Sequence, residues 1–219
     1  QEIDELTTEL ERQAGVVQTV ISLYASKTEV FVEETFFVYG FLRSENGTAL
    51  AGRRIALSWS PDLNVLSTTD VDGEFGASIL FPAGSPAGLA VVEAKFEPQG
   101  LDFQIYGSST SFVQILVKYR PSFIAAMISP ANVTVLSYAE VTGNLSTSGG
   151  LPIPSRPITI LLDGSSLGNV TTDSAGSFLF NFQVPAALSN GTYAVTAAFA
   201  PVADQYEPSN VTLPFTVRW

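Results

Sequence analysis

The residue types that most often do chemistry in proteins are scarce or absent in this sequence. Cysteine and histidine are both missing from its 219 residues, which excludes a Ser-His-Asp triad, a cysteine nucleophile and a histidine-bound metal. Hydrolysis by paired carboxylates is the remaining option. The candidate acids, all beside turn-forming residues or at expected strand edges, are Glu33 with Glu34, Asp70 with Asp72, and Asp204 with Glu207. We expect solvated surface charge at these positions, no catalytic residue, no cofactor and no enzyme activity.

One acidic motif could be a metal site. The stretch from Asp70 through Asp72 to Gly73 has the D-x-D-G pattern that opens calcium-binding loops. A related stretch from Asp173 to Gly176 lacks the second carboxylate, and no glutamate stands where a twelve-residue loop would need it. The other interpretation is a turn, in which the aspartate accepts backbone N–H groups and the glycine takes a positive φ. We expect the turn and no metal.

These two motifs belong to a longer internal repeat. Residues 68–83 read TTDVDGEFGASILFPA and residues 171–186 read TTDSAGSFLFNFQVPA, 103 positions later. The same offset aligns the chain without gaps from Ile21 to Leu116, so we predict two domains of one fold. In each copy apolar residues alternate with polar ones, which is typical of strands with one face on a core. In the second copy we predict strands near 122–128, 138–146, 157–163, 167–172, 176–184, 191–199 and 209–218.

That many short strands, with no helical segments between them, indicates antiparallel β-sandwiches. The motifs R-x-I-x-L, TTD-x-x-G-x-F and G-T-Y-A-V-T-A-A-F resemble the Ig-like repeats of bacterial and archaeal cell-surface proteins. The resemblance covers roughly residues 20–219 and implies two tandem seven-stranded Ig-like sandwiches on the cell exterior. Because the motifs are structural, they imply no activity. The first domain departs from this pattern where Ala90 stands at the position of Tyr193, so any tyrosine-corner hydrogen bond is lost there.

The chain therefore divides into a predicted amphipathic helix over 1–18, an Ig-like domain over 19–119 and a second over 120–219. The linker VKYRPSF, residues 117–123, contains Pro121 and no Gly/Ser tract, which predicts a semi-rigid connection. A net charge of −11 disfavours nucleic acid as a partner. No apolar run reaches 18 residues, so we expect no membrane-spanning segment. Because the sequence begins at Gln1, we expect a processed chain or a fragment, anchored through parts outside it.

Asparagines indicate the compartment. Six of eight begin an N-x-[ST] sequon, although a serine-plus-threonine content of 42 in 219 predicts one or two. The alternative is that a threonine-rich β-protein makes such triplets by accident. Five of the six lie in the second domain, whose low charge would leave glycans to supply hydration. We expect N-glycosylation, export and, since disulfides are absent, an archaeal-like surface protein. The candidates are Asn46, Asn132, Asn144, Asn169, Asn190 and Asn210.

An aromatic stripe sets the first domain apart. In TFFVYGFLR the alternation turns Phe37, Tyr39 and Phe41 outward, where the second domain has Glu140, Thr142 and Asn144. Such a row is either covered or used. The predicted N-terminal helix could cover the stripe, or another subunit or an upstream domain could cover it. Alternatively, the three rings could stack on a sugar, or a β-bulge could reverse the register of the strand and bury them. The contact face of that helix would be Ile3, Leu6, Leu10 and Val17.

From these patterns we expect a non-catalytic extracellular module of a cell-surface protein that acts as a spacer or scaffold, or in adhesion and assembly. Its partners would be other domains of the same longer chain or other surface proteins. One alternative is a carbohydrate-binding module that uses the aromatic stripe, with glycans as ligands. Another is an accessory domain of a larger surface enzyme.

Overall fold

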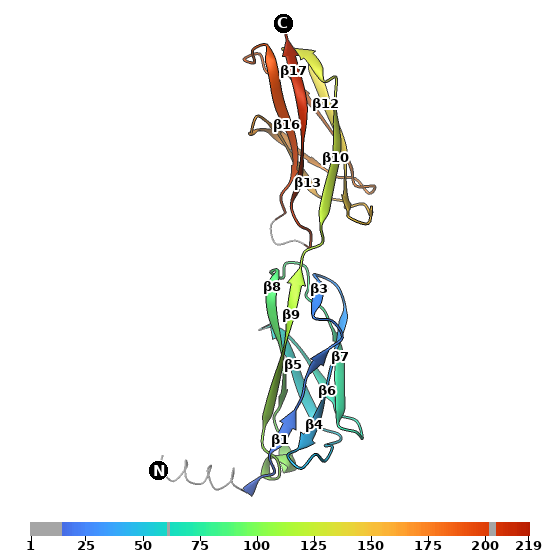
Figure 1. Cartoon of the computed structure of the whole chain (residues 1–219), viewed down its shortest axis with the longest axis vertical. Coiled ribbons are helices and arrows are strands. Elements are labelled where there is room, and N and C mark those ends of the chain that lie inside the picture. Colours follow the sequence, from blue (N-terminus) through green and yellow to red (C-terminus); the bar gives the residue numbers. More distant parts are fainter. Residues whose placement is uncertain (1–14, 61, 202–204) are drawn as a thin grey trace, which may run out of the picture. The chain divides into compact units, whose positions relative to one another are not determined.

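A computed structural model describes residues 15–60, 62–201 and 205–219. The chain divides into two compact units, Gln1–Lys118 and Tyr119–Trp219 (Figure 1). Regular structure in the described residues is almost entirely β-strand, with one short 3-10 helix, η1, over Gly100–Gln104. The prediction of an all-β fold is therefore confirmed. Among these residues no helix has the length and apolar character needed to cross a bilayer.

Unit 1 is built from two facing sheets. In the smaller sheet β4 is central and pairs with β7 on one side. The short strands β1 and β2 pair with successive parts of β4 on its other side. The larger sheet has the order β3-β9-β8-β5-β6. The strands are β1 (Thr19–Ile21), β2 (Tyr24–Ala25), β3 (Glu29–Phe31), β4 (Phe36–Ser44), β5 (Arg54–Ser60), β6 (Leu63–Thr68), β7 (Glu74–Ile79), β8 (Gly88–Phe96) and β9 (Ser109–Lys118).

Unit 2 repeats this plan. Its sheets have the orders β10-β12-β15 and β11-β17-β16-β13-β14. All seven strands predicted for this half of the chain are present within a few residues of their expected bounds. The strands are β10 (Ser122–Ser129), β11 (Asn132–Thr134), β12 (Tyr138–Thr147), β13 (Pro157–Leu162), β14 (Ser165–Thr171), β15 (Ser177–Gln183), β16 (Gly191–Phe199) and β17 (Ser209–Arg218).

The short strands β3 and β11 correct the expectation of purely antiparallel sandwiches. Each continues the first strand of its unit after a break, and each pairs in parallel with the last strand. In unit 2 the break falls at Pro130, which has no N–H to donate to a ladder. The chain keeps its direction while it crosses to the other sheet, so it runs antiparallel to the second strand and parallel to the last.

Equivalent positions form the two cores. Val38 and Leu42 on β4 are fully buried, and so are their counterparts Val141 and Leu145 on β12. Burial of such side chains stabilises a fold by roughly 25 cal/mol per Å² of apolar area. The largest fully buried side chains are Phe96, Phe199, Phe215, Leu42, Ile55, Leu57, Ile115, Leu145, Ile153, Ile158, Ile160 and Val30.

The gap-free alignment of the two repeats is wrong in the last strand. Phe96 pairs with Ser109 in unit 1, and Phe199 pairs with Ser209 in unit 2. The offset is thus 103 at the phenylalanines but 100 at the serines. The loop before the last strand is three residues longer in unit 1, where it contains η1. Apolar alternation fixes strands and faces, but it does not fix the length of a connecting loop.

The predicted helix over 1–18 falls mostly outside the described residues, as do Ile3, Leu6 and Leu10. The prediction is wrong at the C-terminal end of this helix, because Val17 forms a parallel β-bridge with Tyr106. The Val17 N–H donates to the Ile105 carbonyl at 2.8 Å, and the Gly107 N–H donates to the Val17 carbonyl at 3.0 Å. Val17 therefore belongs to the edge of the sandwich rather than to a helix face.

Candidate functional site

The repeated TTD-x-x-G motif forms the expected turn in both units. Asp70 Oδ1 accepts hydrogen bonds from the N–H groups of Asp72 and Glu74, both at 2.9 Å. Asp173 Oδ1 accepts the equivalent pair at 2.8 and 2.9 Å. The glycine that ends each motif has a positive φ, +75° in unit 1 and +73° in unit 2. One carboxylate oxygen of each aspartate thus accepts two backbone N–H groups of its own turn.

The threonine before each aspartate is a buried link between loops. Thr172 is 3% exposed; its hydroxyl donates to the Ile153 carbonyl at 2.9 Å and accepts from the Arg156 N–H at 2.9 Å. Thr69 makes the same pair of bonds, at 2.6 Å to the Leu50 carbonyl and 2.8 Å from an arginine N–H. Because the two hydroxyls are used in the same way, the motif is a structural element of the repeat.

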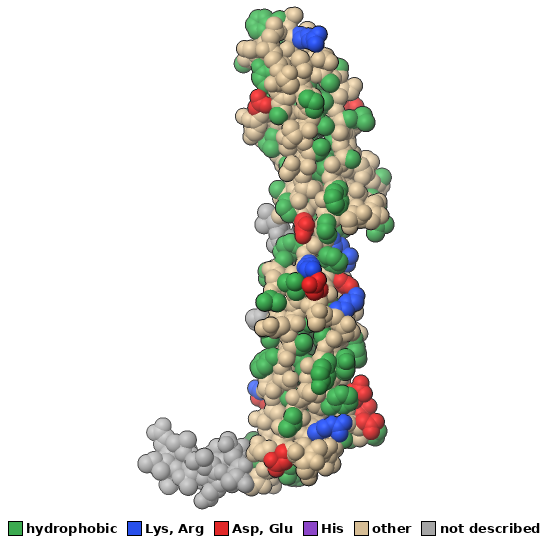
Figure 2. All heavy atoms as spheres, viewed as in Figure 1, with side chains coloured by type: hydrophobic (Ala, Val, Ile, Leu, Met, Phe, Trp, Pro, Cys, Tyr) green, Lys and Arg blue, Asp and Glu red, His purple; other side chains and the backbone are tan. Residues whose placement is uncertain are grey.

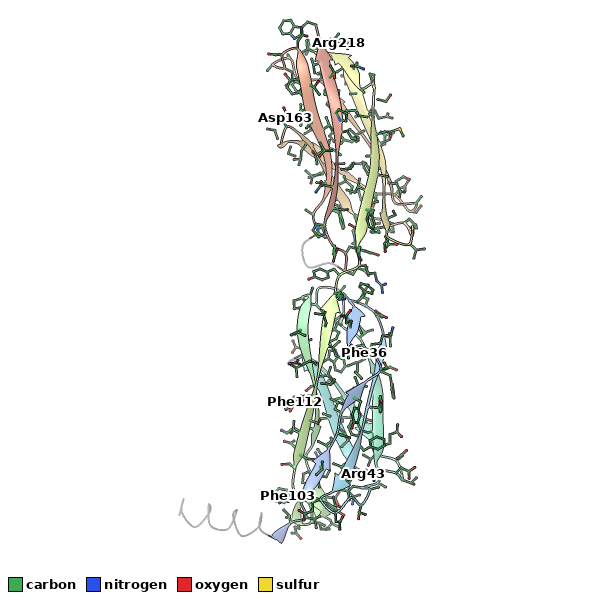
Figure 3. The ribbon with its side chains drawn as sticks, in the orientation of Figure 1. Phe36, Arg43, Phe103, Phe112, Asp163 and Arg218 are labelled. Atoms are coloured by element: carbon green, nitrogen blue, oxygen red, sulfur yellow. The ribbon has the colours of Figure 1, made fainter. Side chains whose placement is uncertain are left out.

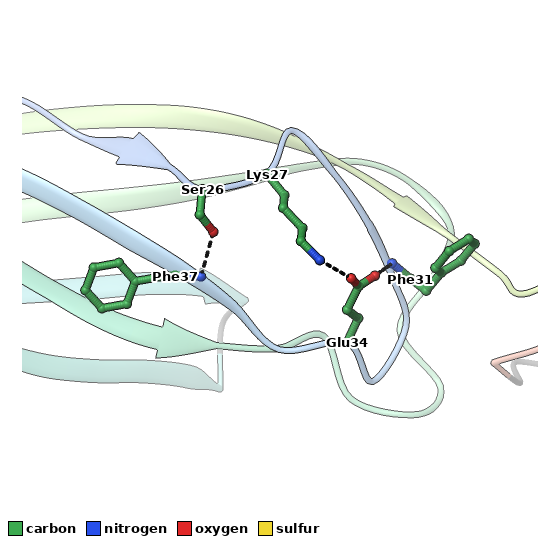
Figure 4. A network of polar contacts seen from close by, with 5 residues as sticks. All are labelled: Ser26, Lys27, Phe31, Glu34 and Phe37. Carbon is green, nitrogen blue, oxygen red and sulfur yellow. Dashed lines mark hydrogen bonds and ion pairs between the residues drawn. The ribbon is translucent and has the colours of Figure 1, made fainter.

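The acidic pairs do not converge on a site in the part of the chain that the structure describes. Glu33 is exposed, while Glu34 forms an ion pair with Lys27 and accepts the Phe31 N–H at 2.8 Å (Figure 4). Asp204 lies outside the described residues. No group of three or more metal-ligating side chains occurs within the described ranges.

A charged group with a shifted pKa lies on the surface of unit 1. The carboxylate of Glu97 bonds to Lys95 Nζ and raises the pKa of that lysine. A raised lysine pKa keeps the ammonium charged at neutral pH, so Lys95 is not a base poised for catalysis. Another ion pair of unit 1, between Arg53 Nε and Asp102 at 2.8 Å, holds the loop that contains η1.

The aromatic stripe lies on the outer face of the small sheet of unit 1. The neighbouring residues Phe36, Val38, Gly40 and Leu42 are buried, so the predicted register is present and a register-flipping bulge is excluded. The Phe37 and Tyr39 rings are nearly parallel, 13° apart with centroids 6.2 Å from each other. Tyr24 of β2 joins them, 5.6 Å from Tyr39.

Most of this stripe is covered by its own neighbours. The Arg43 guanidinium lies 5.5 Å from the centre of the Phe41 ring, a cation–π distance. A Cβ added at Gly76 would lie 2.5 Å from Phe37 Cζ, so the Phe37 ring extends across the adjacent strand. Tyr39 and Phe41 are half-buried, and Phe37 remains 43% exposed. Phe37 is therefore the ring that a ligand would meet first.

A hollow that the sequence did not indicate lies at one end of unit 1. It has a volume of about 490 Å³. Phe103, which is labelled at that end of the unit in Figure 3, contributes an exposed ring. The hollow depends on the longer loop of unit 1. The alternation of apolar and polar residues does not predict the length of this loop. Its lining residues are Val16, Gln18, Glu97, Pro98, Gln99, Phe103, Tyr106, Gly107 and Ser108.

The tyrosine corner is present in unit 2. The Tyr193 hydroxyl donates to the Ser189 carbonyl at 3.0 Å and accepts the Ser189 N–H at 2.9 Å. Unit 1 has Ala90 at the equivalent position on β8, which offers no hydroxyl. Phenolic hydroxyls that bond to backbone a few residues upstream are a recurrent feature of Ig-type sandwiches.

The sequon asparagines differ in their surroundings. Five have exposed side chains, whereas Asn144 is half-buried and its Nδ2 donates to the Ala175 carbonyl at 2.9 Å. Three of the exposed ones stand on strands of the five-stranded sheet of unit 2, and the others stand in turns or bends. The exposed asparagines are Asn46, Asn132, Asn169, Asn190 and Asn210.

Comparisons with known proteins match the architecture alone. No protein-family model and no curated protein sequence matches the chain. Among solved structures, the Escherichia coli adhesin FdeC is 15% identical over 91% of this chain and 64% of its own, with a TM-score of 0.41. Invasin, a bacterial integrin-binding protein, is 16% identical over 91% and 39%, with a TM-score of 0.48. The titin domains Z1Z2 are 13% identical over 91% and 96%, with a TM-score of 0.39.

The chain thus spans less than two thirds of the length of the two bacterial proteins. One of them is described as an adhesin and the other as an integrin-binding protein. The titin domains match as well, and all three TM-scores are below 0.5. The likeness therefore carries no weight in assigning a function to this chain.

Proposed function

We propose that this chain is a non-catalytic part of an exported cell-surface protein and acts there as a spacer. The supporting observation is the path of the chain through each unit. In unit 1 the Thr19 hydroxyl bonds to Ser109 at 2.9 Å, so the first and last strands begin side by side. At the other end of the same unit, Phe31 pairs with Lys118 as both strands finish. The chain enters at one end of the sandwich and leaves at the opposite end.

Unit 2 has the same arrangement. The Ser122 hydroxyl donates to Ser209 Oγ at 2.7 Å where the strands begin, and Thr134 pairs with Arg218 where they finish. Tension on the two ends of a unit would load the parallel pair along its length. Its hydrogen bonds would then resist together instead of opening one at a time. A structural element that carries load is what a spacer requires.

The side-chain chemistry supports the same proposal. The chain contains neither histidine nor cysteine, and the polar residues of the repeated motifs are used in turns and loop links. Among the described residues, Glu34 and Glu29 form surface ion pairs and Asp70 caps backbone N–H groups. Carbohydrate binding by Phe37, Tyr39 and Phe41 is the alternative that has a specific observation in its favour, namely two nearly parallel rings of which one is exposed.

Labelling of intact cells tests the export that this function requires. A membrane-impermeant amine reagent should modify the chain before lysis, since all three lysines have exposed side chains. A cytosolic protein of the same cells serves as the control and should stay unlabelled. Labelling of the chain after lysis alone would rule the proposal out.

A further inference from the structure

We propose that Asn46, Asn132, Asn169, Asn190 and Asn210 carry N-linked glycans, and that Asn144 does not although its sequence matches. The inference rests on the export in the proposed function, because the lipid-linked sugar donor is used outside the cytosol. In the reaction, the asparagine Nδ2 displaces a lipid (di)phosphate from the anomeric carbon of an oligosaccharide. A C–N bond forms, the C–O bond to phosphate breaks with its electron pair, and the amide loses one proton. A cellular transferase supplies the catalysis.

Three of the five sites share one local structure. Each is the tripeptide Asn-Val-Thr on a strand of the five-stranded sheet of unit 2, beginning at Asn132, Asn169 and Asn210. In each the central valine packs in or against the core, so the asparagine and the threonine two residues later face outward together. The amide that would carry the sugar and the hydroxyl that completes the sequon are therefore exposed on the same face.

The outer face of this sheet has room for sugars. Asn210 pairs with Ala198, Ala198 with Thr159, and Thr159 with Asn169. These four residues form one row across four neighbouring strands, with a sequon asparagine at each end of the row. Three strand spacings separate these two asparagines by about 14 Å. The residues between them are small and uncharged. On the face shown in Figure 2, charged side chains are sparse over unit 2, where glycans would add hydration.

The two remaining sites lie in Asn-Gly-Thr bends. At Asn46 the Oδ1 atom accepts the Thr48 hydroxyl at 3.0 Å and the Thr48 N–H at 3.3 Å. These bonds use the oxygen of the amide, so they do not engage the nitrogen that would bond to the sugar. Asn190 is exposed beside the tyrosine corner, one residue after Ser189.

Asn144 is the exception because its nitrogen has a structural role. Its Nδ2 joins β12 to the Ala175 carbonyl, which lies inside the repeated turn from Asp173 to Gly176. The side chain is also half-buried. A sugar would replace one of the two hydrogens on this nitrogen, and its bulk would stand against the turn that the repeat uses to connect two strands.

The chain contains its own negative controls. Asn64 and Asn181 are exposed on strands, as the proposed sites are, but neither is followed two residues later by a hydroxyl side chain. If exposure alone directed modification, these two would be modified as well. A requirement for the complete sequon leaves them bare.

Glycopeptide mass spectrometry of the chain purified from the cells that make it tests the proposal. Sugar is expected at the five proposed sites and none at Asn144, Asn64 or Asn181. Thr212→Ala should abolish the sugar at Asn210 without touching that residue, whereas Thr212→Ser should retain it. Bare asparagines at all five sites, or a sugar at Asn144, would overturn the inference.

A second measurement separates structural from modification roles. In chain made without glycosylation, Asn144→Gln should lower the melting temperature of unit 2 by a few degrees because a hydrogen bond is lost. Asn210→Gln should leave it unchanged. The reverse ranking would refute the distinction. If surface labelling places the chain outside the cell but the five sites are bare, the glycan proposal fails while the spacer function stands.

Discussion

Gly143 on β12 is a position where one added methyl group should destabilise unit 2. An ideal Cβ there would lie 2.4 Å from Phe178 Cζ and 2.6 Å from the Ala125 carbonyl oxygen. Normal contact between carbon atoms begins at about 3.5 Å. The Phe178 ring and the backbone of β10 would therefore each have to move by roughly 1 Å. Phe178 is 5% exposed and packs in the core, which leaves little freedom to move.

The expected cost follows from two opposing terms. Overpacking a core typically costs about 1–3 kcal/mol, and the upper end applies because two separate contacts are violated. Replacing a strand glycine by alanine returns about 0.5–1 kcal/mol through backbone entropy. The net loss for Gly143→Ala is therefore about 2 kcal/mol. In a domain of this size each kcal/mol shifts the melting temperature by about 4–8 °C, so unit 2 should melt roughly 8–16 °C lower.

Gly149→Ala is the matched control. The nearest atom to a Cβ at Gly149 is Thr147 Oγ1 at 3.9 Å, so this variant should be as stable as the parent or slightly more stable. Hydrogen exchange followed by mass spectrometry reads the two units separately, and protection should fall in β12 and β15 of Gly143→Ala while unit 1 is unchanged. Equal protection in the two variants would refute the packing described for this strand.

Three further substitutions test individual contacts. Thr172→Val should cost about 1–3 kcal/mol, measured by denaturant unfolding, because a buried N–H and a carbonyl lose their partner. Tyr193→Phe should cost about 1 kcal/mol through loss of the tyrosine corner, whereas Tyr138→Phe, at a ring 70% exposed, should cost nothing measurable. If the aromatic stripe binds sugars, the parent chain should give signals on a glycan array and Phe37→Ala should abolish them. Phe112→Ala, on the other sheet of unit 1, should retain these signals. If the parent chain gives no signal, carbohydrate binding is rejected.

The elements that local patterns determine were predictable. Alternation of apolar residues with period two located the long strands of unit 2, and the aspartate and glycine of TTD-x-x-G determined the turn, because each signal lies within a few residues. The outward direction of Phe37 and Asn144 followed from the same alternation.

Features that depend on distant partners were not predictable. β11 has three residues, too few for a period to show, and its pairing with β17 is set by the path of the chain between sheets. The hydrogen bond from Asn144 to Ala175 spans 31 positions, so alternation predicted its direction but not its partner. The hollow beside Phe103 arises from three extra loop residues that a gap-free alignment had hidden.

Single-molecule force measurement on the full chain, held by its two ends, tests the spacer function most directly. Each unit has about 100 residues, which extend to roughly 350 Å when unfolded. Two separate force peaks are expected, each releasing roughly 30 nm of chain, because each sandwich loads its own parallel strand pair. Extension without resolvable peaks, or one peak that releases both units together, would contradict the account of two load-bearing units.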